Sequence, residues 1–285
     1  MTRSPALNRG VAAAVLEPAT GPADRLSSRS GAKPRRRLLG RIVWSAILPL
    51  GILGFWQVTT AIGLFSVVQL PPPGMVVDAA GELIERGALG QYVAISTQRV
   101  VVGFAAGASL GLLLGAVTGL GRSWDQVLGS TLGGIRAVPA LAWVPLLILW
   151  LKIGEESKVT LIAIGAFFPV YTTVSAGLRH VDRQLVEVGR AFGLRGLRLF
   201  TTVQLPAVLP SVISGLRLAL AQSWLFLVAA ELIASSSGLG FLLVDSQNNG
   251  RVDRIFLAIV LLALLGKTTD ALIGIFERWA VRRWT

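Results

Sequence analysis

The chain has 285 residues, of which 53% are hydrophobic and 15% charged, and its mean hydropathy is +0.67. An ordinary soluble domain carries about a quarter charged residues, so this composition predicts a membrane protein. The sequence has no cysteine and a single histidine, His180, which excludes disulfides, thiol catalysis, a cysteine-based zinc site and any site that needs two histidines. The formal charge of +12 flanks apolar stretches, which fits the positive-inside rule better than nucleic-acid binding.

The N-terminal residues 1–40 are rich in Ala, Ser, Pro and Arg and show no sustained hydrophobic period. This composition predicts a disordered, basic cytoplasmic tail. The alternative explanation is that the start codon has been assigned too early. A first transmembrane helix is predicted at residues 42–65, because a helix needs about 20 apolar residues to cross the hydrocarbon core. Residues 66–96 then form an external loop. The prolines at 71–73 exclude a helix there, and residues 76–86 can form a short amphipathic helix outside the membrane.

Five further apolar stretches follow and define a transmembrane domain over residues 97–276. A polar segment, residues 179–206, separates the fourth span from the fifth, and we call it the hook. The predicted fold is therefore an all-α membrane protein with six transmembrane helices. Six spans place both termini on one side, where residues 277–285 form the C-terminus. The five stretches are residues 97–120, 128–151, 159–178, 208–233 and 255–276.

Positive charge indicates which side faces the cytoplasm. Lys and Arg gather in the N-terminal tail, in the hook and at the C-terminus, whereas the loops of the opposite side hold few. Because Lys and Arg accumulate in cytoplasmic loops, we expect both termini and the hook in the cytoplasm.

The second span carries a glycine at every fourth position. Such residues share one slowly drifting helical face, and the missing side chains let another helix approach closely. We interpret the stripe as a helix-packing seam, and a glycine wall along a transport pathway is the alternative. The glycines are Gly103, Gly107, Gly111, Gly115 and Gly119.

Several residues at span depth are candidates for a transport pathway. A charge at the bilayer centre costs at least about 2.5–3.5 kcal/mol on insertion scales, so such a residue faces protein or water, or extends to the interface. Arg136 could line an anion path or lock two helices together. Arg217 could extend to the interface, and a structural partner is expected for Glu231. The candidate pathway residues are Arg136, Pro139, Arg217, Trp224 and Glu231.

Lys267 also lies within a span, near its cytoplasmic end. We expect it to pair with Asp270 or with a lipid phosphate. Gly266-Lys267-Thr268 resembles the end of a phosphate-binding loop, but position 261, where that loop needs glycine, is Leu261. The sequence contains neither HExxH nor GxSxG, and no acid pair or Ser–His set lies at span depth. We therefore predict a protein that is not an enzyme and has no nucleotide or metal site of its own.

The hook predicts two short helices joined at a glycine. Asp182 can cap a helix that ends at Phe192, and Gly193 can provide the left-handed residue that follows. A second short helix is expected over residues 196–204. Phe192 and Leu194 would be exposed at the bend, which is typical of an interaction site. A helix lying in the lipid interface, with its arginines towards the headgroups, is the alternative.

The spacing within the hook resembles the EAA loop of bacterial ATP-binding-cassette importer permeases. That pattern is Glu-Ala-Ala, three residues, Gly, nine residues and Ile-x-Leu-Pro. Here Glu187 stands six residues before Gly193, and Val203-Gln204-Leu205-Pro206 closes the pattern. Val188 and Gly189 replace the two alanines and Val203 replaces the isoleucine, all of them small or aliphatic exchanges.

The resemblance continues outside the hook, over about residues 42–284. It indicates the branch that handles aliphatic sulfonates, taurine and nitrate, with aliphatic sulfonates favoured. The further matching segments are Leu70-Pro71-Pro72-Pro73, the glycine stripe 103–119, Arg136-Ala137-Val138-Pro139, residues 145–150, Glu231-Leu232-Ile233, Gly238-Leu239-Gly240 and Leu264-Leu265-Gly266-Lys267.

The resemblance implies an importer assembled in the bacterial plasma (inner) membrane. Two copies of the permease would form the pathway as a homodimer, and two cytoplasmic ATPase subunits would bind ATP and each receive one hook. A periplasmic or lipid-anchored binding protein would deliver substrate, with the outward segment 235–254 as its contact or as a gate. No cofactor is expected in this chain, and no nucleic acid as a partner. The residues implied in coupling to the ATPase are Glu187, Arg190, Ala191, Phe192, Gly193, Leu194, Leu205 and Pro206.

Two other classes of protein compete with this one. An ion-coupled secondary transporter of small anions often shows inverted repeats and acidic residues at mid-membrane, and the sequence offers neither. A membrane enzyme would need a catalytic set, which is also missing from the sequence.

Overall fold

The computed structural model describes residues 34–284, apart from the side chains of residues 34–46, 234, 280, 281, 283 and 284. Most of the predicted tail, residues 1–33, lies outside the described residues. The chain divides into two parts, Met1–Gly54 and Phe55–Thr285. All regular elements of the described residues are helices, with no strand among them.

Helix α1 (Pro34–Ala61) begins in the first part and ends in the second. Residues 34–40, which the sequence assigns to the tail, are thus helical, and the helix ends before the predicted boundary at residue 65. Within the second part, Trp56 donates its indole N–H to the carbonyl oxygen of Pro71 at 2.9 Å. This bond fastens the end of α1 to the proline segment.

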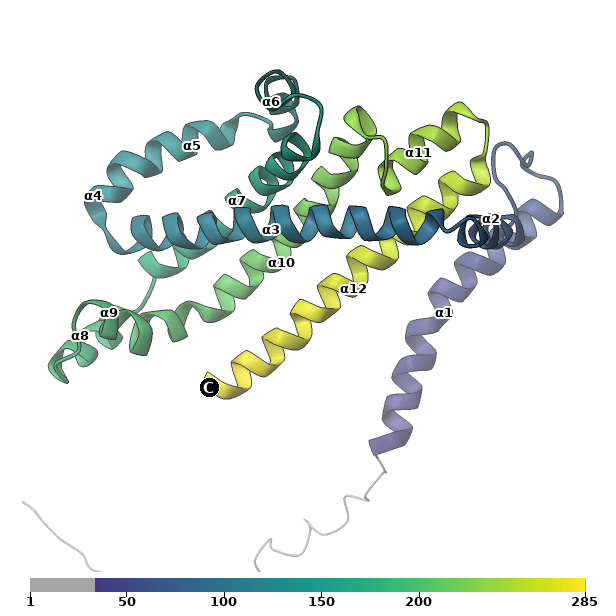
Figure 1. Ribbon diagram of the computed structural model, residues 1–285. Coiled ribbons are helices and arrows are strands. Elements are labelled where there is room, and N and C mark those ends of the chain that lie inside the picture. The colour runs from purple at the N-terminus through teal and green to yellow at the C-terminus, as the bar shows by residue number, and fades with distance from the viewer. Residues whose placement is uncertain (1–33, 285) are drawn as a thin grey trace, which may run out of the picture. The chain divides into compact units, whose positions relative to one another are not determined.

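The second part contains the remaining helices, joined mostly by short turns (Figure 1). In chain order they are α2 (Pro73–Glu85), α3 (Ala88–Leu120), α4 (Arg122–Trp124), the π-helical turn η2 (Asp125–Gly129), α5 (Ser130–Ala137), the 3-10 turn η3 (Ala140–Trp143), α6 (Val144–Leu151), α7 (Glu155–Arg179), α8 (Arg183–Ala191), α9 (Gly196–Leu199), the π-helical turn η4 (Phe200–Gln204), α10 (Leu205–Ala234), α11 (Leu239–Asn248) and α12 (Val252–Trp284).

The core lies where α7 packs between α3 and α10. Ala166, Val170 and Val174 of α7 are buried there against Ala108 of α3 and Val212 of α10. These side chains are small or β-branched, which lets the three helix axes approach closely. α12 packs on α10, so the long helices form one continuous bundle within the second part.

Four helical runs among the described residues are long and apolar enough to cross a membrane. They are α3, α7, the continuous run Gly196–Ile233 and the stretch Val252–Trp279 of α12. The bent pair described next would be a fifth, and the apolar stretch Ile47–Ala61 of α1 is shorter than these. The described helices thus account for four or five spans by length and composition, where the sequence predicts six.

The predicted span at residues 128–151 is broken into two helical pieces in the structure. The helical pieces Arg122–Ala137 and Ala140–Leu151 meet at 87°. Val138, between them, has extended backbone angles (φ −74, ψ 124). Proline disfavours the helical conformation in the residue before it and lacks an N–H to continue the helix, so Pro139 accounts for the break.

The second part has two distinct ends along α3. α2 and α11 lie at the end where α3 begins, and α4, α8 and α9 lie at the end where it finishes (Figure 1). We call these the α11 end and the hook end. α7 and α12 begin at the α11 end, and α10 begins at the hook end.

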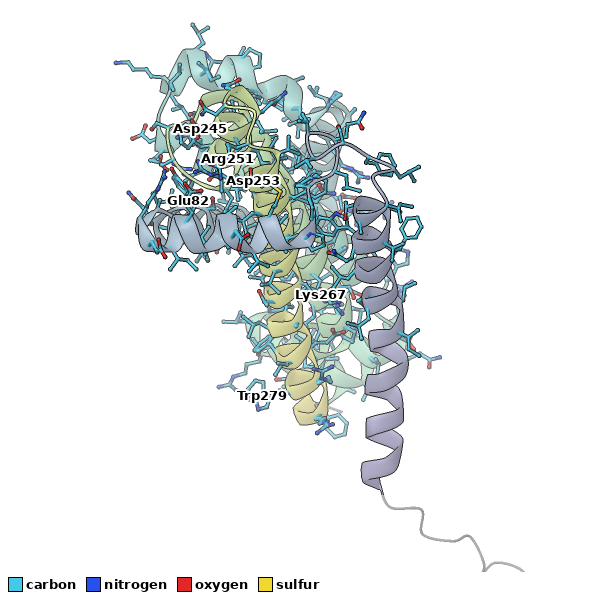
Figure 2. All side chains as sticks on the ribbon, turned by 90° about the vertical axis from the view of Figure 1, so that its right-hand side faces the viewer. Glu82, Asp245, Arg251, Asp253, Lys267 and Trp279 are labelled. Carbon is cyan, nitrogen blue, oxygen red and sulfur yellow. The ribbon has the colours of Figure 1, made fainter. Side chains whose placement is uncertain are left out.

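At the α11 end, ion pairs connect α2 to the start of α12. Glu82 contacts Arg251 at 2.8 Å and Arg254 at 3.0 Å, and Arg251 also contacts Asp253 at 2.8 Å. Figure 2 shows Glu82, Arg251 and Asp253 gathered beside α2. The hydrogen bonds from Arg251 and Arg254 lower the pKa of Glu82 to about 2. The Asp253 and Glu82 carboxylates in turn raise the pKa of Arg251.

Candidate functional site

The hook folds into a capped helix that ends in a glycine turn. The carboxylate of Asp182 accepts a hydrogen bond from the backbone N–H of Gln184 at 2.8 Å, which caps α8. At the other end of α8, Gly193 has φ +80. Its N–H donates to the carbonyl of Arg190 at 2.9 Å, and the N–H of Leu194 donates to that of Gly189 at 3.0 Å. This pair of bonds is a Schellman motif, which needs a left-handed residue where Gly193 lies.

The bend is anchored to the rest of the hook through Gly189. Gly189 is buried, and a Cβ there would lie 2.7 Å from Leu199 and 3.1 Å from Val203. The smaller residue at this position therefore lets α8 pack on the turn that leads into α10. Gly189 replaces alanine in the pattern noted above, and the close packing gives a physical reason for the exchange.

The outer face of the hook is apolar and uncovered. Phe192 is 83% exposed and Leu197 is 76% exposed, and Val188 and Leu185 are also exposed. Large apolar side chains that protrude together from a polar segment mark a contact surface. The other predicted coupling residues divide by burial: Glu187, Arg190, Ala191 and Gly193 are exposed, whereas Leu194, Leu205 and Pro206 are half-buried.

The second half of the hook has no break before α10. α9, η4 and α10 form one helical run, and Pro206 lies in the first turn of α10, where its missing N–H costs nothing. The sequence predicts a second short helix over residues 196–204 that leads through Pro206 into the fifth span, and the structure contains the continuous helical run Gly196–Ile233. A movement of the hook would therefore be transmitted along the α10 axis.

The glycine stripe of α3 faces α7 along its whole length. A Cβ would lie 2.6 Å from Ile162 at Gly103, 2.8 Å from the Phe167 carbonyl at Gly111, and 2.9 Å from Val174 at Gly115. Gly107 and Gly119 face Ala163 and Leu178 in the same way. The stripe thus lies in a close helix–helix contact.

A buried charge cluster joins three helices at the α11 end. Arg99 of α3 donates from Nη1 to Glu231 of α10 at 2.6 Å. It also donates from Nε and Nη2 to both oxygens of Glu155 of α7, at 2.6 and 2.5 Å. The Arg99 and Glu231 side chains are 3% and 0% exposed, whereas that of Glu155 is 62% exposed. The ammonium group of Lys158 lies 3.1 Å from the Glu155 carboxylate, so the cluster contains two positive and two negative charges.

Glu231 is fully satisfied by further hydrogen bonds. Its carboxylate accepts from Ser96 Oγ at 2.8 Å and from the backbone N–H of Gly240 at 2.7 Å. Gly238, with φ +114, and Gly240 both lie against the Glu231 side chain, where a Cβ would collide with it. The segment between α10 and α11 therefore has glycines where it folds over a buried carboxylate.

Glu231 thus has a structural partner. The pairing explains why its charge is tolerated at this depth, and no role in the transport pathway is needed to explain it. Sequence reasoning missed that partner, Arg99. Arg99 falls within the predicted span 97–120, and its charge at span depth was the signal that could have found it.

Arg136 lies at the end of α5, beside the bend at Pro139. It is exposed and has no hydrogen bond or ion pair with any described residue. A cavity of about 490 Å³ opens beside it, between η2, α5 and the second half of α7. The helix-locking pair considered for Arg136 is absent from the described residues of this chain.

The remaining candidate pathway residues connect α10 to α12. Arg217 contacts Asp270 at 2.9 Å and Glu277 at 3.2 Å. Trp224 is buried and donates its indole N–H to Thr269 Oγ1 at 3.0 Å. The sequence predicts that Lys267 pairs with Asp270 or with a lipid phosphate, and in the structure Asp270 accepts hydrogen bonds from Arg217.

A family model described as the binding-protein-dependent transport system inner membrane component matches residues 107–282. The match covers the second half of α3, the bent pair, the hook and nearly all that follows. The chain belongs to this family of inner membrane transport components.

Curated relatives support the same class over a longer stretch. A protein of Escherichia coli (strain K12) described as an aliphatic sulfonates transport permease is 42% identical over 252 residues, which are 88% of this chain and 95% of the relative. A protein of Bacillus subtilis (strain 168) with the same description is 40% identical over 246 residues, 86% of this chain and 89% of the relative. A taurine transport system permease of Escherichia coli (strain K12) is 31% identical over 219 residues, 75% of this chain and 80% of the relative.

Solved structures support the fold. An inward-facing structure of the MetNI methionine ABC transporter matches with a TM-score of 0.54 and 21% identity, and covers 73% of this chain and 98% of that chain. The chain is thus a membrane permease of the ABC importer class, and it is not an enzyme. A secondary transporter and a membrane enzyme are both disfavoured by this membership.

Proposed function

We propose that the chain forms the membrane pathway of an ATP-driven importer for aliphatic sulfonates. Support comes from the relatives described as aliphatic sulfonates permeases, at 40% and 42% identity over nearly their whole lengths, against 31% for the taurine permease. A small sulfonate carries one negative charge and three acceptor oxygens. The unpaired Arg136 beside a cavity suits such an anion.

In this proposal the chain crosses the bacterial inner membrane six times. The spans are α1, α3, the bent pair, α7, the run that contains α10, and α12. The hook and both termini face the cytoplasm, because the hook end carries most of the Lys and Arg at the helix ends. The α11 end then faces outward.

The hook is the docking site for a separate ATPase subunit. The observation that carries this assignment is the exposure of Phe192 at 83%, directly before the left-handed Gly193. An aromatic side chain held out on a capped helix is suited to fill a groove of a partner. Glu187, Arg190 and Ala191, exposed on the same helix, would complete the contact.

The assembly contains two copies of the permease, two ATPases that bind ATP, and an external substrate-binding protein. The binding protein would contact the α11 end, where α2, α11 and the ion pairs of Glu82 form the surface. Closure of the ATPases would move the hooks and, through the unbroken run into α10, switch the access of the pathway.

The docking assignment is tested by Phe192→Asp. The variant chain is expressed with its ATPase, and we expect co-purification of the ATPase to be lost, because a charge replaces the apolar anchor. Ile153→Asp is the matched control, since Ile153 is also an exposed apolar residue, at 71%, but lies near the α11 end. Equal recovery of the ATPase with both variants would refute the docking role.

The transport assignment is tested in liposomes. The full complex should accumulate ethanesulfonate only when ATP and the binding protein are supplied. The permease alone should accumulate none under a proton or sodium gradient. Uptake by the permease alone would identify an ion-coupled carrier instead.

A further inference from the structure

The cavity beside Arg136 contains more hydrogen-bond donors than this chain uses. It is lined by three stretches of chain that belong to the hook-end half of the molecule. The charged and hydroxyl-bearing lining residues are Asp125, Ser130, Arg136, Tyr171, Thr172, Ser175 and Arg179.

Most of these groups already have partners within the chain. Arg179 contacts Asp125 at 2.6 Å and donates to Ser175 Oγ at 2.6 Å. Thr172 donates to the carbonyl of Phe168 at 2.8 Å, and Ser130 donates to that of Gln126 at 3.2 Å. These bonds fix the wall of the cavity and engage the hydroxyl hydrogens of Thr172 and Ser130.

The side chains of two lining residues, Arg136 and Tyr171, make no hydrogen bond with a described residue. Arg136 has no partner among the described residues. The Tyr171 side chain is buried and stacks on Phe167 at a ring distance of 5.7 Å, but its hydroxyl donates no hydrogen bond to a described residue. The hydroxyl oxygen is accessible from the cavity and can donate to a group that enters it.

The lining of the cavity carries a net positive charge. Arg136 and Arg179 contribute two positive charges and Asp125 one negative charge, so the lining carries a net charge of +1. Asp125 is paired with Arg179, which leaves the charge of Arg136 uncompensated. A cavity with one unpaired cation and a free hydroxyl donor fits a monovalent oxyanion.

The size of the cavity fits the same ligand. Its volume of about 490 Å³ lies in the range of small-molecule sites, and its apolar lining, Leu132 and Ala176, leaves room for a short alkyl chain.

From these observations we infer that Arg136 and Tyr171 form an oxyanion-binding station, which holds the sulfonate group of the substrate in the hook-end half of the pathway. The inference rests on the proposed function for the identity of its ligand. The guanidinium supplies the charge and paired N–H donors, and the Tyr171 hydroxyl supplies a third donor. Such a station binds weakly, since a site within a pathway must also release its substrate.

Binding is measured first, on the purified complex with its ATPase and without the binding protein. Saturation-transfer NMR on the alkyl protons of ethanesulfonate should give a signal with the wild type. Arg136→Gln should weaken binding about ten- to a hundredfold, and Arg136→Lys should retain part of it, because a charge-assisted hydrogen bond is worth about 1.5–3 kcal/mol. Tyr171→Phe should weaken it about two- to tenfold, since it loses a neutral donor and keeps the ring.

Lys267→Gln is the matched control. It removes one positive charge at span depth from α12, and because Lys267 does not line the cavity the variant should bind ethanesulfonate as the wild type does. No signal with the wild type, equal signals with Arg136→Gln and the wild type, or equal losses with Lys267→Gln would each overturn the inference. A complex of Arg136→Gln that no longer contains both permease copies would also overturn it, by showing a role in assembly.

Uptake in liposomes then separates this inference from the proposed function. If the site holds the substrate, Arg136→Gln lowers ethanesulfonate uptake while ATP hydrolysis stimulated by the binding protein stays near the wild-type rate. A wild-type complex that binds ethanesulfonate but does not import it would contradict the proposed function and leave the site standing. Normal uptake by Arg136→Gln would contradict the proposed site but not the proposed function.

Discussion

The guanidinium of Arg99 donates to the carboxylate of Glu231 at 2.6 Å, with 3% and 0% of the two side chains exposed. The pair joins α3 to α10 at the point where the chain leaves α10 and folds back into α11. Ser96 and the N–H of Gly240 complete the bonds to Glu231. The α11 end is therefore held by a buried electrostatic contact, in contrast to the apolar packing of the middle of the bundle.

Breaking this pair should be strongly destabilising. Arg99→Met leaves Glu231 buried without its counter-ion, and we expect the free energy of unfolding to fall by about 3–5 kcal/mol. Thermal unfolding of the purified permease in detergent measures the effect. Arg86→Met is the control, because Arg86 forms an exposed pair with Glu82 and should change stability by about 1 kcal/mol or less. Similar melting shifts for both variants would contradict the buried role.

The glycine stripe predicts that a larger residue within it destabilises the protein, because it overpacks the contact between α3 and α7. Gly111→Ala places a Cβ 2.8 Å from the Phe167 carbonyl and 2.9 Å from Val170. The added methyl group should push α3 away from α7 and lower the free energy of unfolding by about 1–3 kcal/mol. Gly90→Ala, in the same helix with nothing within 4 Å, should instead be neutral or stabilise by up to about 1 kcal/mol. Melting temperatures of the two variants should therefore move apart, and a shared direction would argue against a packing seam.

The left-handed turn at Gly193 predicts that a substitution there prevents binding of the ATPase but leaves the permease folded. Gly193→Arg forces a side chain onto a residue with φ +80, at a cost of about 1–2 kcal/mol, and distorts the presentation of Phe192. We expect the variant to insert in the membrane and to lose its ATPase on co-purification.

The matched control for that experiment is Gly250→Arg. Gly250 also has a positive φ, +67, and open space around it, but it lies at the α11 end. The same backbone strain should there leave the ATPase bound. Retention of the ATPase by Gly193→Arg would mean that the hook tolerates the change and does not couple through this turn.

The ion pairs of Glu82 predict how stability depends on pH. Because the folded pKa of Glu82 is about 2 and its ordinary value is 4.5, the contribution is fully present above pH 4.5 and disappears as the pH falls towards 2. The difference in melting temperature between the wild type and Glu82→Gln should accordingly be constant down to about pH 4.5 and shrink below it.

Glu85→Gln provides the comparison, since Glu85 lies on the same helix and makes no ion pair among the described residues. Its difference from the wild type should stay small over the whole range. A difference for Glu82→Gln that grows as the solution becomes more acidic would contradict the ion pairs with Arg251 and Arg254.

Several features could be predicted from the sequence because they depend on neighbours along the chain. Apolar runs of sufficient length and the four-residue period of glycines are local patterns. The cap by Asp182 and the left-handed Gly193 follow from local backbone chemistry as well. The family could be recognised because the spacing from Glu187 to Pro206 is also a property of one continuous segment.

Other features depend on residues that lie far apart in the chain. Arg99 and Glu231 are separated by more than a hundred positions, and no local period relates them. Arg217 contacts Asp270 from a different helix, and the spacing along the chain, which favours the nearer Lys267, does not reveal this partner. The bend of 87° after Ala137 was missed because a proline permits several angles, and packing selects one.

The sequence alone thus determined the class of this protein: its composition requires lipid around it, and its hook carries the pattern of an importer permease. The tertiary structure decided which charges are partnered and which remain free. Glu231 belongs to a buried structural cluster, whereas Arg136 faces a cavity without a partner in the described chain. The physical reason is that hydrophobicity and helix geometry are set within a few residues, while the energy of a charge in a membrane depends on what the fold places next to it.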